Sequence, residues 1–247
     1  MITTATDREG RFAVDEFARR NHLEITDWKL AKEISAAILE GKRVSFCSEL
    51  PVEGALPEEL EERSLIQTRA FSENRESKGR KQEEKFSGDS DGDKGNDMGI
   101  LVSNRKISAG FHNRILQLIP RNIYLGIGCR KNTSVERIEA AATECFEKAG
   151  IDPRALVCAA SIDLKKDEPG LLAFCEKQGI PLRIFTREEL AGVQGSKNGS
   201  EFVEQVTGVD NVCERSALAA GGERLILEKQ VREGVTTAIA EKCAKIF

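Results

Sequence analysis

The stretch from Tyr124 to Ser134 constrains the fold of this chain more than any other, because it combines a strand pattern, a glycine turn and a helix start. Gly126 and Gly128 have no Cβ, so the backbone there can turn tightly and approach a ligand closely. Thr133 is followed three residues later by Glu136, which is the spacing of a capping box. The stretch therefore predicts a buried strand that leads through a glycine turn into a capped helix.

Two basic side chains, Arg130 and Lys131, lie between the glycine turn and the predicted helix start. Backbone N–H groups and the positive end of the helix dipole would converge on the same place. The turn therefore predicts a site for a carboxylate or a phosphate, and a tight structural turn explains the same pattern equally well. The third glycine of a dinucleotide-binding motif would fall at Lys131, so a nicotinamide or flavin site is disfavoured.

The last half of the chain alternates strand and helix patterns, which predicts an α/β fold with a mixed, mostly parallel sheet flanked by helices. The helix after Thr133 should end at Gly150, and Thr186 with Glu189 forms a second capping-box pattern. Further helices are predicted near Ser200 and Asn211. Strands are expected at residues 123–128, 156–161 and 182–185, and a second helix is expected at 169–178. A terminal β-hairpin is expected at 224–228 and 235–240, across a loop at 229–234.

The first half of the chain has fewer predicted helices and strands. Helices are predicted at residues 11–20 and 27–40 and a strand at 44–47, which are too few elements to close a core, so residues 1–60 are interpreted as a partial α/β remnant. Residues 61–98 are charged, rich in Gly and Ser and poor in apolar residues, which predicts a disordered linker. Residues 99–120 are expected to form a connecting strand and segment before a domain at 121–247.

Composition excludes several classes of function. The net charge of −4 and the 5% aromatic content argue against a nucleic-acid surface. No apolar run is long enough for a membrane span and no leader is evident at the N-terminus, so a cytoplasmic protein without a membrane partner is expected. The seven cysteines include no Cys-x-x-Cys pair and there are two histidines, so no metal site is expected. Cys129 lies near a predicted helix N-terminus, where a thiol pKa can fall, although packing explains it more simply.

A second polar segment follows the predicted strand at 156–161. Ser161, Asp163 and Lys165 alternate, so in an extended stretch they would share one face. Glu168 follows shortly after them. A carboxylate beside an ammonium in a cleft can act in general acid–base catalysis, and a surface ion pair explains the same spacing.

Six motifs in order closely resemble the CbiG family, the cobalt-precorrin-5A hydrolases of anaerobic cobalamin (vitamin B12) biosynthesis, over the C-terminal domain of that family. They are residues 125–134, 160–165, 167–171, 200–203, 207–209 and the closing run from Gly221 to Ala240. Residues 2–18 also resemble the passage from the family's N-terminal domain to its central region, and that N-terminal domain is missing before them. Asn132 stands where the family usually has glycine, so a tighter or strained turn is expected there.

The resemblance implies an enzyme that opens the lactone ring of cobalt-precorrin-5A and releases acetaldehyde to give cobalt-precorrin-5B. The cobalt arrives within the corrinoid substrate, so no cofactor is expected. The expected catalytic residues are Asp163, Lys165 and Glu168. The expected substrate-binding residues are Gly126, Gly128, Cys129, Arg130, Lys131, Thr133, Ser134, Ser161, Ser200 and Glu201.

An alternative also follows from the resemblance, because the same C-terminal domain resembles a stand-alone protein of the aerobic cobalamin pathway. The chain would then be a non-catalytic corrinoid-binding or partner module, either truncated or split from its enzyme. A separate N-terminal-domain partner or a homo-oligomer is expected in that case.

Overall fold

The computed structural model describes residues 12–63, 98–107, 114–193 and 211–246, and it divides into two compact units. Unit 1 contains the described parts of residues 1–103, 107–120 and 245–247, and unit 2 contains residues 104–106 and the described parts of 121–244. Within the described ranges, no helix has both the length and the apolar character needed to cross a membrane. Most of the segment expected to be a disordered linker, and the helix expected near Ser200, lie outside the described residues.

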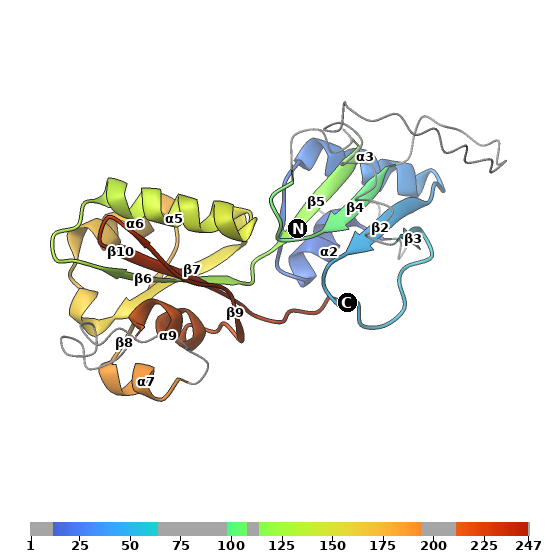
Figure 1. The fold of residues 1–247 in the computed structure, drawn as a ribbon. Helices are drawn as coiled ribbons and strands as arrows, with labels where there is room; N and C mark the ends of the chain where they lie inside the picture. The colour runs from blue at the N-terminus through green and yellow to red at the C-terminus, as the bar shows by residue number, and fades with distance from the viewer. Residues whose placement is uncertain (1–11, 64–97, 108–113, 194–210, 247) are drawn as a thin grey trace, which may run out of the picture. The chain divides into compact units, whose positions relative to one another are not determined.

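Unit 1 is a five-stranded sheet covered by two helices (Figure 1). Its strands run in the order β1-β5-β4-β2-β3; β1 is antiparallel to β5, and the other neighbours are parallel. The elements are α2 (Val14–Arg20), β1 (Leu23–Ile25), α3 (Trp28–Leu39), β2 (Val44–Ser48), β3 (Leu60–Glu62), β4 (Gly99–Val102) and β5 (Ile115–Pro120).

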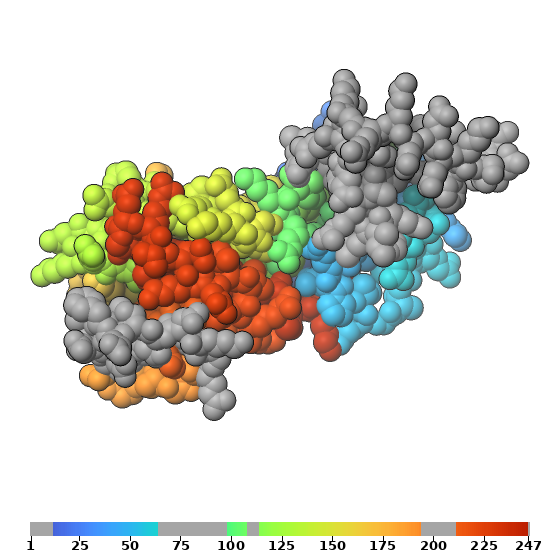
Figure 2. All heavy atoms as spheres, viewed as in Figure 1, coloured from blue at the N-terminus to red at the C-terminus, as the bar shows by residue number. Residues whose placement is uncertain are grey.

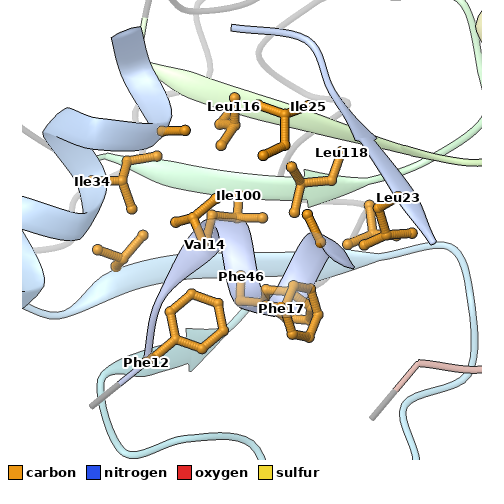
Figure 3. Close-up of a cluster of buried hydrophobic side chains, with 14 of the residues drawn as sticks. Phe12, Val14, Phe17, Leu23, Ile25, Ile34, Phe46, Ile100, Leu116 and Leu118 are labelled. Carbon is orange, nitrogen blue, oxygen red and sulfur yellow. The ribbon is translucent and has the colours of Figure 1, made fainter. Parts of the chain in front are cut away.

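One hydrophobic core joins the early and late segments of unit 1 (Figure 3). Phe17 from α2 and Ile34 from α3 pack with Phe46, Ile100 and Leu118 from the central strands. The segments 1–60 and 99–120, which the sequence analysis treats apart, therefore contribute strands to the same sheet. Strand β3 also begins at Leu60, so the first residues assigned to the linker belong to this sheet.

Unit 2 is a mixed five-stranded sheet in the order β8-β7-β6-β10-β9. Strands β6, β7 and β8 are parallel, and β10 is antiparallel to both β6 and β9. The elements are β6 (Ile123–Cys129), α5 (Val135–Ala149), β7 (Leu156–Ile162), α6 (Pro169–Gln178), β8 (Leu182–Phe185), α7 (Arg187–Ala191), α9 (Val212–Ala219), β9 (Arg224–Arg232) and β10 (Val235–Glu241), with 3₁₀ turns at Pro153–Ala155 and Asp163–Lys165.

The helices of unit 2 cover both faces of its sheet. Helices α5 and α6 lie on one face and α9 lies on the other (Figure 1). Figure 2 shows α9 and the β9–β10 hairpin, in orange to red, as one continuous surface. The predicted fold class, a mixed and mostly parallel sheet with flanking helices and a terminal strand pair, is confirmed.

The terminal hairpin is longer than predicted. Its strands reach Arg232 and Val235, so the expected loop at 229–234 is wrong and Glu233 and Gly234 alone connect them. Glu233 has φ 48° and Gly234 has φ 83°, the left-handed conformations that a tight two-residue turn requires. Glutamate is uncommon in that conformation, which is why the turn was not recognised in the sequence.

Candidate functional site

Strands β6, β7 and β8 end on one edge of the unit 2 sheet, at Cys129, Ile162 and Phe185. Helices α5 and α6 begin beside that edge. Their starts are in direct contact, since a Cβ on Gly170 would lie 2.1 Å from the Thr133 carbonyl oxygen. In open α/β sheets this edge is where ligands bind.

The turn between β6 and α5 is held by Thr133, whose hydroxyl donates to the Arg130 carbonyl oxygen at 2.7 Å. Helix α5 begins after Ser134, and no side-chain hydrogen bond caps it. The capping box predicted for Thr133 and Glu136 is therefore wrong, because the threonine hydroxyl is used inside the turn. Asn132 has φ 61°, so the position where the family usually has glycine does adopt the left-handed conformation.

The two cations of this turn face solvent. Arg130 and Lys131 are exposed, and neither forms an ion pair with another described residue. The Arg130 side chain passes over the hairpin turn, where a Cβ on Gly234 would lie 3.3 Å from its Cδ. Both groups face solvent, and the anion site that the sequence predicts at this turn stays a prediction.

Lys165 and Glu168 form the most buried charged pair at the edge. The Lys165 Nζ lies 3.8 Å from Glu168 Oε2, and the two side chains are 18% and 5% exposed. Glu168 Oε1 is buried and has no hydrogen-bond partner among the described residues. A buried carboxylate oxygen that lacks a donor is unusual in a folded protein. The position therefore suits a ligand or a water that donates a hydrogen bond.

Asp163, the third residue expected to be catalytic, begins a 3₁₀ turn. Strand β7 ends at Ile162, and Asp163–Lys165 form that turn, so the prediction of one extended polar face through Ser161, Asp163 and Lys165 is wrong. The turn carries Lys165 toward Glu168 and leaves the half-buried Asp163 at the rim. Ser161 is fully buried, and its hydroxyl donates to the Ile127 carbonyl oxygen at 2.7 Å.

Cys129 lies against this pair. Burial raises the pKa of its thiol, and the negative charge of Glu168 adds to the rise, whereas Lys165 and a hydrogen bond with Thr133 oppose it. Of the two interpretations of Cys129, a raised thiol pKa favours packing, because desolvation outweighs the nearby positive charge. Cys129 is half-buried at the end of β6.

The two glycines of β6 point to the face of the sheet that α9 covers. A Cβ on Gly126 would lie 1.7 Å from the Cys213 carbonyl oxygen in α9, and one on Gly128 would lie 2.5 Å from Thr236 Oγ1. Close packing of α9 therefore requires glycine at Gly126 whether or not a ligand binds. Ser200 and Glu201, the remaining predicted binding residues, lie outside the described residues.

Asn211, which precedes α9, carries a second buried polar atom without a hydrogen-bond partner among the described residues. It is 1% exposed, and its Nδ2 has no hydrogen-bond partner within the described ranges. The sequence predicts a helix start there and indicates no role for the side chain. Its only sequence signal is an asparagine at a helix start, which is common in structural caps. Across the described part of the chain, no cluster of three or more His, Cys, Asp or Glu side chains could hold a metal ion.

Two family models cover nearly all of the described chain. Residues 12–120 match the cobalamin biosynthesis central region, and residues 123–240 match the cobalamin synthesis G C-terminus. The boundary between the matches falls where unit 1 passes into unit 2.

Three curated relatives are similar to this chain. The cobalt-precorrin-5A hydrolase of Salmonella typhimurium is 32% identical over 50% of this chain and 35% of its own length. The protein CobE of a Sinorhizobium species is 31% identical over 53% of this chain and 88% of its own length. The probable cobalt-precorrin-5A hydrolase of Methanocaldococcus jannaschii is 27% identical over 97% of this chain and 65% of its own length. The alignments thus span about a third of the first relative and two thirds of the third.

Proposed function

We propose a reaction for this chain from the premise that it belongs to the CbiG family of cobalamin biosynthesis proteins, whose central-region and C-terminal models it matches in order. The proposed role is in cobalamin biosynthesis by the anaerobic route. The proposed reaction is hydrolytic opening of the lactone ring of cobalt-precorrin-5A, with loss of acetaldehyde, to give cobalt-precorrin-5B. Relatives named as cobalt-precorrin-5A hydrolases support it.

The observation that carries the proposal is the buried Glu168 carboxylate beside the Lys165 ammonium. Lactone hydrolysis needs a base that takes a proton from water and a positive group that stabilises the oxyanion. Glu168 Oε1 is the base in this proposal, since it has no other partner among the described residues. Lys165 stabilises the negative charge that develops on the lactone carbonyl oxygen.

The substrate is a macrocycle fringed with carboxylates, and the site supplies cations for them. Arg130 and Lys131 are exposed beside the catalytic pair and bind peripheral carboxylates. The alcohol oxygen freed by lactone opening becomes the aldehyde oxygen when the carbon–carbon bond to the fragment breaks. In this proposal the electron pair of that bond stays on the macrocycle, and Asp163, at the start of the 3₁₀ turn, accepts the hydroxyl proton. Cobalt remains in the substrate throughout.

Acetaldehyde release tests the proposal. The purified chain is incubated anaerobically with cobalt-precorrin-5A, beside the variants Glu168→Gln and Asp163→Asn. Loss of a general base lowers kcat by about 10²-fold or more, which is the expected result for Glu168→Gln, with a smaller loss for Asp163→Asn. Glu176→Gln makes the same chemical change at an exposed position of α6 and should keep wild-type activity.

Two outcomes would contradict the proposal. Glu168→Gln that keeps full activity removes Glu168 from the mechanism. A wild-type chain that binds a corrinoid tightly and releases no acetaldehyde instead supports a non-catalytic binding module.

A further inference from the structure

The two central strands of the unit 2 sheet, β6 and β7, stop pairing with each other before either strand ends. Their parallel ladder ends with Gly126 opposite Ala160. Beyond that pair, β6 stays paired with β10 as far as Cys129, and β7 stays paired with β8 as far as Ile162. The last residues of β6 and β7, at the edge that carries the candidate site, are therefore held by their outer neighbours and not by each other's backbone.

The side chain of Ser161 connects the two strands past the end of this ladder. Ser161 and Ile127 each lie one residue beyond the last paired residues. The Ser161 hydroxyl donates to the Ile127 carbonyl oxygen at 2.7 Å, and Ser161 is fully buried. A hydrogen bond in the low dielectric of a protein interior is stronger than the same bond in water. The hydroxyl thus holds the strand ends together where the backbone ladder has stopped.

Each of these strand ends leads into one half of the candidate site. Arg130 lies three positions after Ile127, in the turn that follows β6. Asp163 and Lys165 form the 3₁₀ turn that follows β7, which begins two positions after Ser161. The distance between the two strand ends therefore sets the distance between the exposed cations of one turn and the charged pair of the other.

The burial of Ser161 decides how it can act. A hydroxyl that has no exposed surface, and whose proton is already donated to a backbone carbonyl, offers no donor to a ligand. Reaction rates are nevertheless sensitive to such a group, because a misplacement of about 1 Å can lower the rate about 10²-fold. Ser161 is therefore suited to act through the two turns and not on the substrate itself.

We propose that Ser161 is a positioning residue. Its hydroxyl fixes the separation of the β6 and β7 ends, so that Arg130 and Lys131 on one turn and the Lys165–Glu168 pair beside the other act on the same bound corrinoid. The proposal rests on the function proposed above and adds to it a residue that touches neither the substrate nor the reacting atoms.

Steady-state kinetics of acetaldehyde release from cobalt-precorrin-5A test this role. Ser161→Ala removes the hydroxyl, and we expect kcat to fall about tenfold because the two turns lose their fixed separation. KM should change less than about twofold, since the cations that hold the peripheral carboxylates remain. Ser161→Cys fills the same space with a weak donor, so it should be as slow as the alanine variant.

Ser216→Ala is the matched control. Ser216 is also fully buried, and its hydroxyl donates to the Val212 carbonyl oxygen at 2.7 Å within α9. A longer bond of 3.3 Å reaches the Ala160 carbonyl oxygen, in the paired part of β7. Both alanine variants remove buried hydrogen bonds, so both should lower the melting temperature by a similar amount. Only Ser161→Ala should lower kcat, because a merely structural role leaves kcat of the folded protein at its wild-type value.

Hydrogen exchange tests the strand contact without turnover. In Ser161→Ala, the backbone amides of residues 129–134 and 163–168 should exchange about fivefold faster, which is the effect of one lost hydrogen bond on local opening. In Ser216→Ala both segments should exchange at the wild-type rate.

Four results would overturn the positioning role: an unchanged kcat in Ser161→Ala, full recovery of kcat in Ser161→Cys, an equal loss of kcat in Ser216→Ala, or unchanged hydrogen exchange at both turns. Failure of the proposed reaction is distinguishable from these. A wild-type chain that releases no acetaldehyde, but whose turns exchange faster in Ser161→Ala, keeps the strand contact and loses the hydrolase. Acetaldehyde release with kcat independent of Ser161 keeps the hydrolase and loses the positioning role.

Discussion

Two helix starts in unit 2 carry the same pattern, a threonine followed three residues later by a glutamate, and they are built differently. At α7, Thr186 Oγ1 accepts from the Glu189 N–H and the Glu189 carboxylate accepts from the Thr186 N–H, which is a complete capping box. At α5, the Thr133 hydroxyl bonds the Arg130 carbonyl oxygen and the helix begins one residue later. A side chain that could cap its helix instead holds the turn that lines the candidate site.

The difference has a tertiary cause. The Thr133 carbonyl oxygen packs on Gly170 at the start of α6, and the Thr133 hydroxyl bonds the Arg130 carbonyl oxygen across the turn. At α7 the capping hydrogen bonds are made within the helix start itself, between Thr186 and Glu189. The comparison teaches that a capping pattern predicts a helix start well, and that neighbouring elements decide which hydrogen bonds the pattern makes.

The largest expected effect comes from breaking the contact between the two helix starts. Gly170→Ala places a Cβ 2.1 Å from the Thr133 carbonyl oxygen, so backbone must move. We expect a loss of about 2–3 kcal/mol in the free energy of unfolding. Gly192→Ala, the matched change at α7, should be neutral or slightly stabilising. Urea denaturation measures both, and equal stabilities for the two variants would contradict the close packing of the helix starts.

The second-largest expected effect distinguishes the role of Thr133 from that of Thr186. Thr133→Ala and Thr186→Ala each remove one hydrogen bond and should each cost about 1 kcal/mol of stability. Thr133→Ala also loosens the turn that carries Arg130 and Lys131, so it should lower kcat/KM for cobalt-precorrin-5A, whereas Thr186→Ala should not. Parallel loss of activity in both variants would show that stability alone explains the result.

The smallest effect concerns the two glutamates. Glu189→Ala removes half of the capping box and should lower the free energy of unfolding by about 0.5–1 kcal/mol.

Glu136 is exposed, and hydrogen bonds from its own N–H and from Ser134 lower the pKa of its carboxyl below 4.5. A depressed pKa stabilises the fold above the unfolded pKa, and this contribution is lost as the pH falls through the folded value. Glu136→Gln should therefore be slightly less stable than wild type at pH 7.

At a pH below the folded pKa of Glu136, the Glu136→Gln variant and the wild type should converge in stability, because the carboxyl is then protonated in both the folded and the unfolded states. Urea denaturation at the two pH values measures this. A stability difference that does not change with pH would show that the hydrogen bonds of the Glu136 carboxylate contribute nothing.

Much of unit 2 could be predicted from its sequence. The strands at β6, β7 and β8 are apolar runs, and Gly150 and Gly179 end α5 and α6 with φ values of 65° and 63°. These are local properties, since one residue type sets the backbone conformation at each position. Unit 1 was less predictable, because β4 and β5 complete its sheet only after a long intervening segment.

The candidate site was also predictable from the sequence only in part. Sequence patterns placed Arg130, Lys131, Lys165 and Glu168 near one edge, because the carboxyl ends of parallel strands meet there. The patterns did not reveal the 3₁₀ turn that brings Lys165 to Glu168, or the orphaned groups of Glu168 and Asn211. Whether a buried polar atom has a partner depends on every element packed around it, and spacing along one segment carries no such information.

The sequence by itself therefore determined the class of the fold, the order of the elements of unit 2 and the motifs of its family, since propensity, turn chemistry and apolar periodicity are local. Only the tertiary structure decided the bonding of Thr133, the raised pKa of the Cys129 thiol and the close packing of Gly126 on α9. These depend on desolvation and on contacts between segments far apart in the chain, such as Thr133 with Gly170 and Gly126 with Cys213.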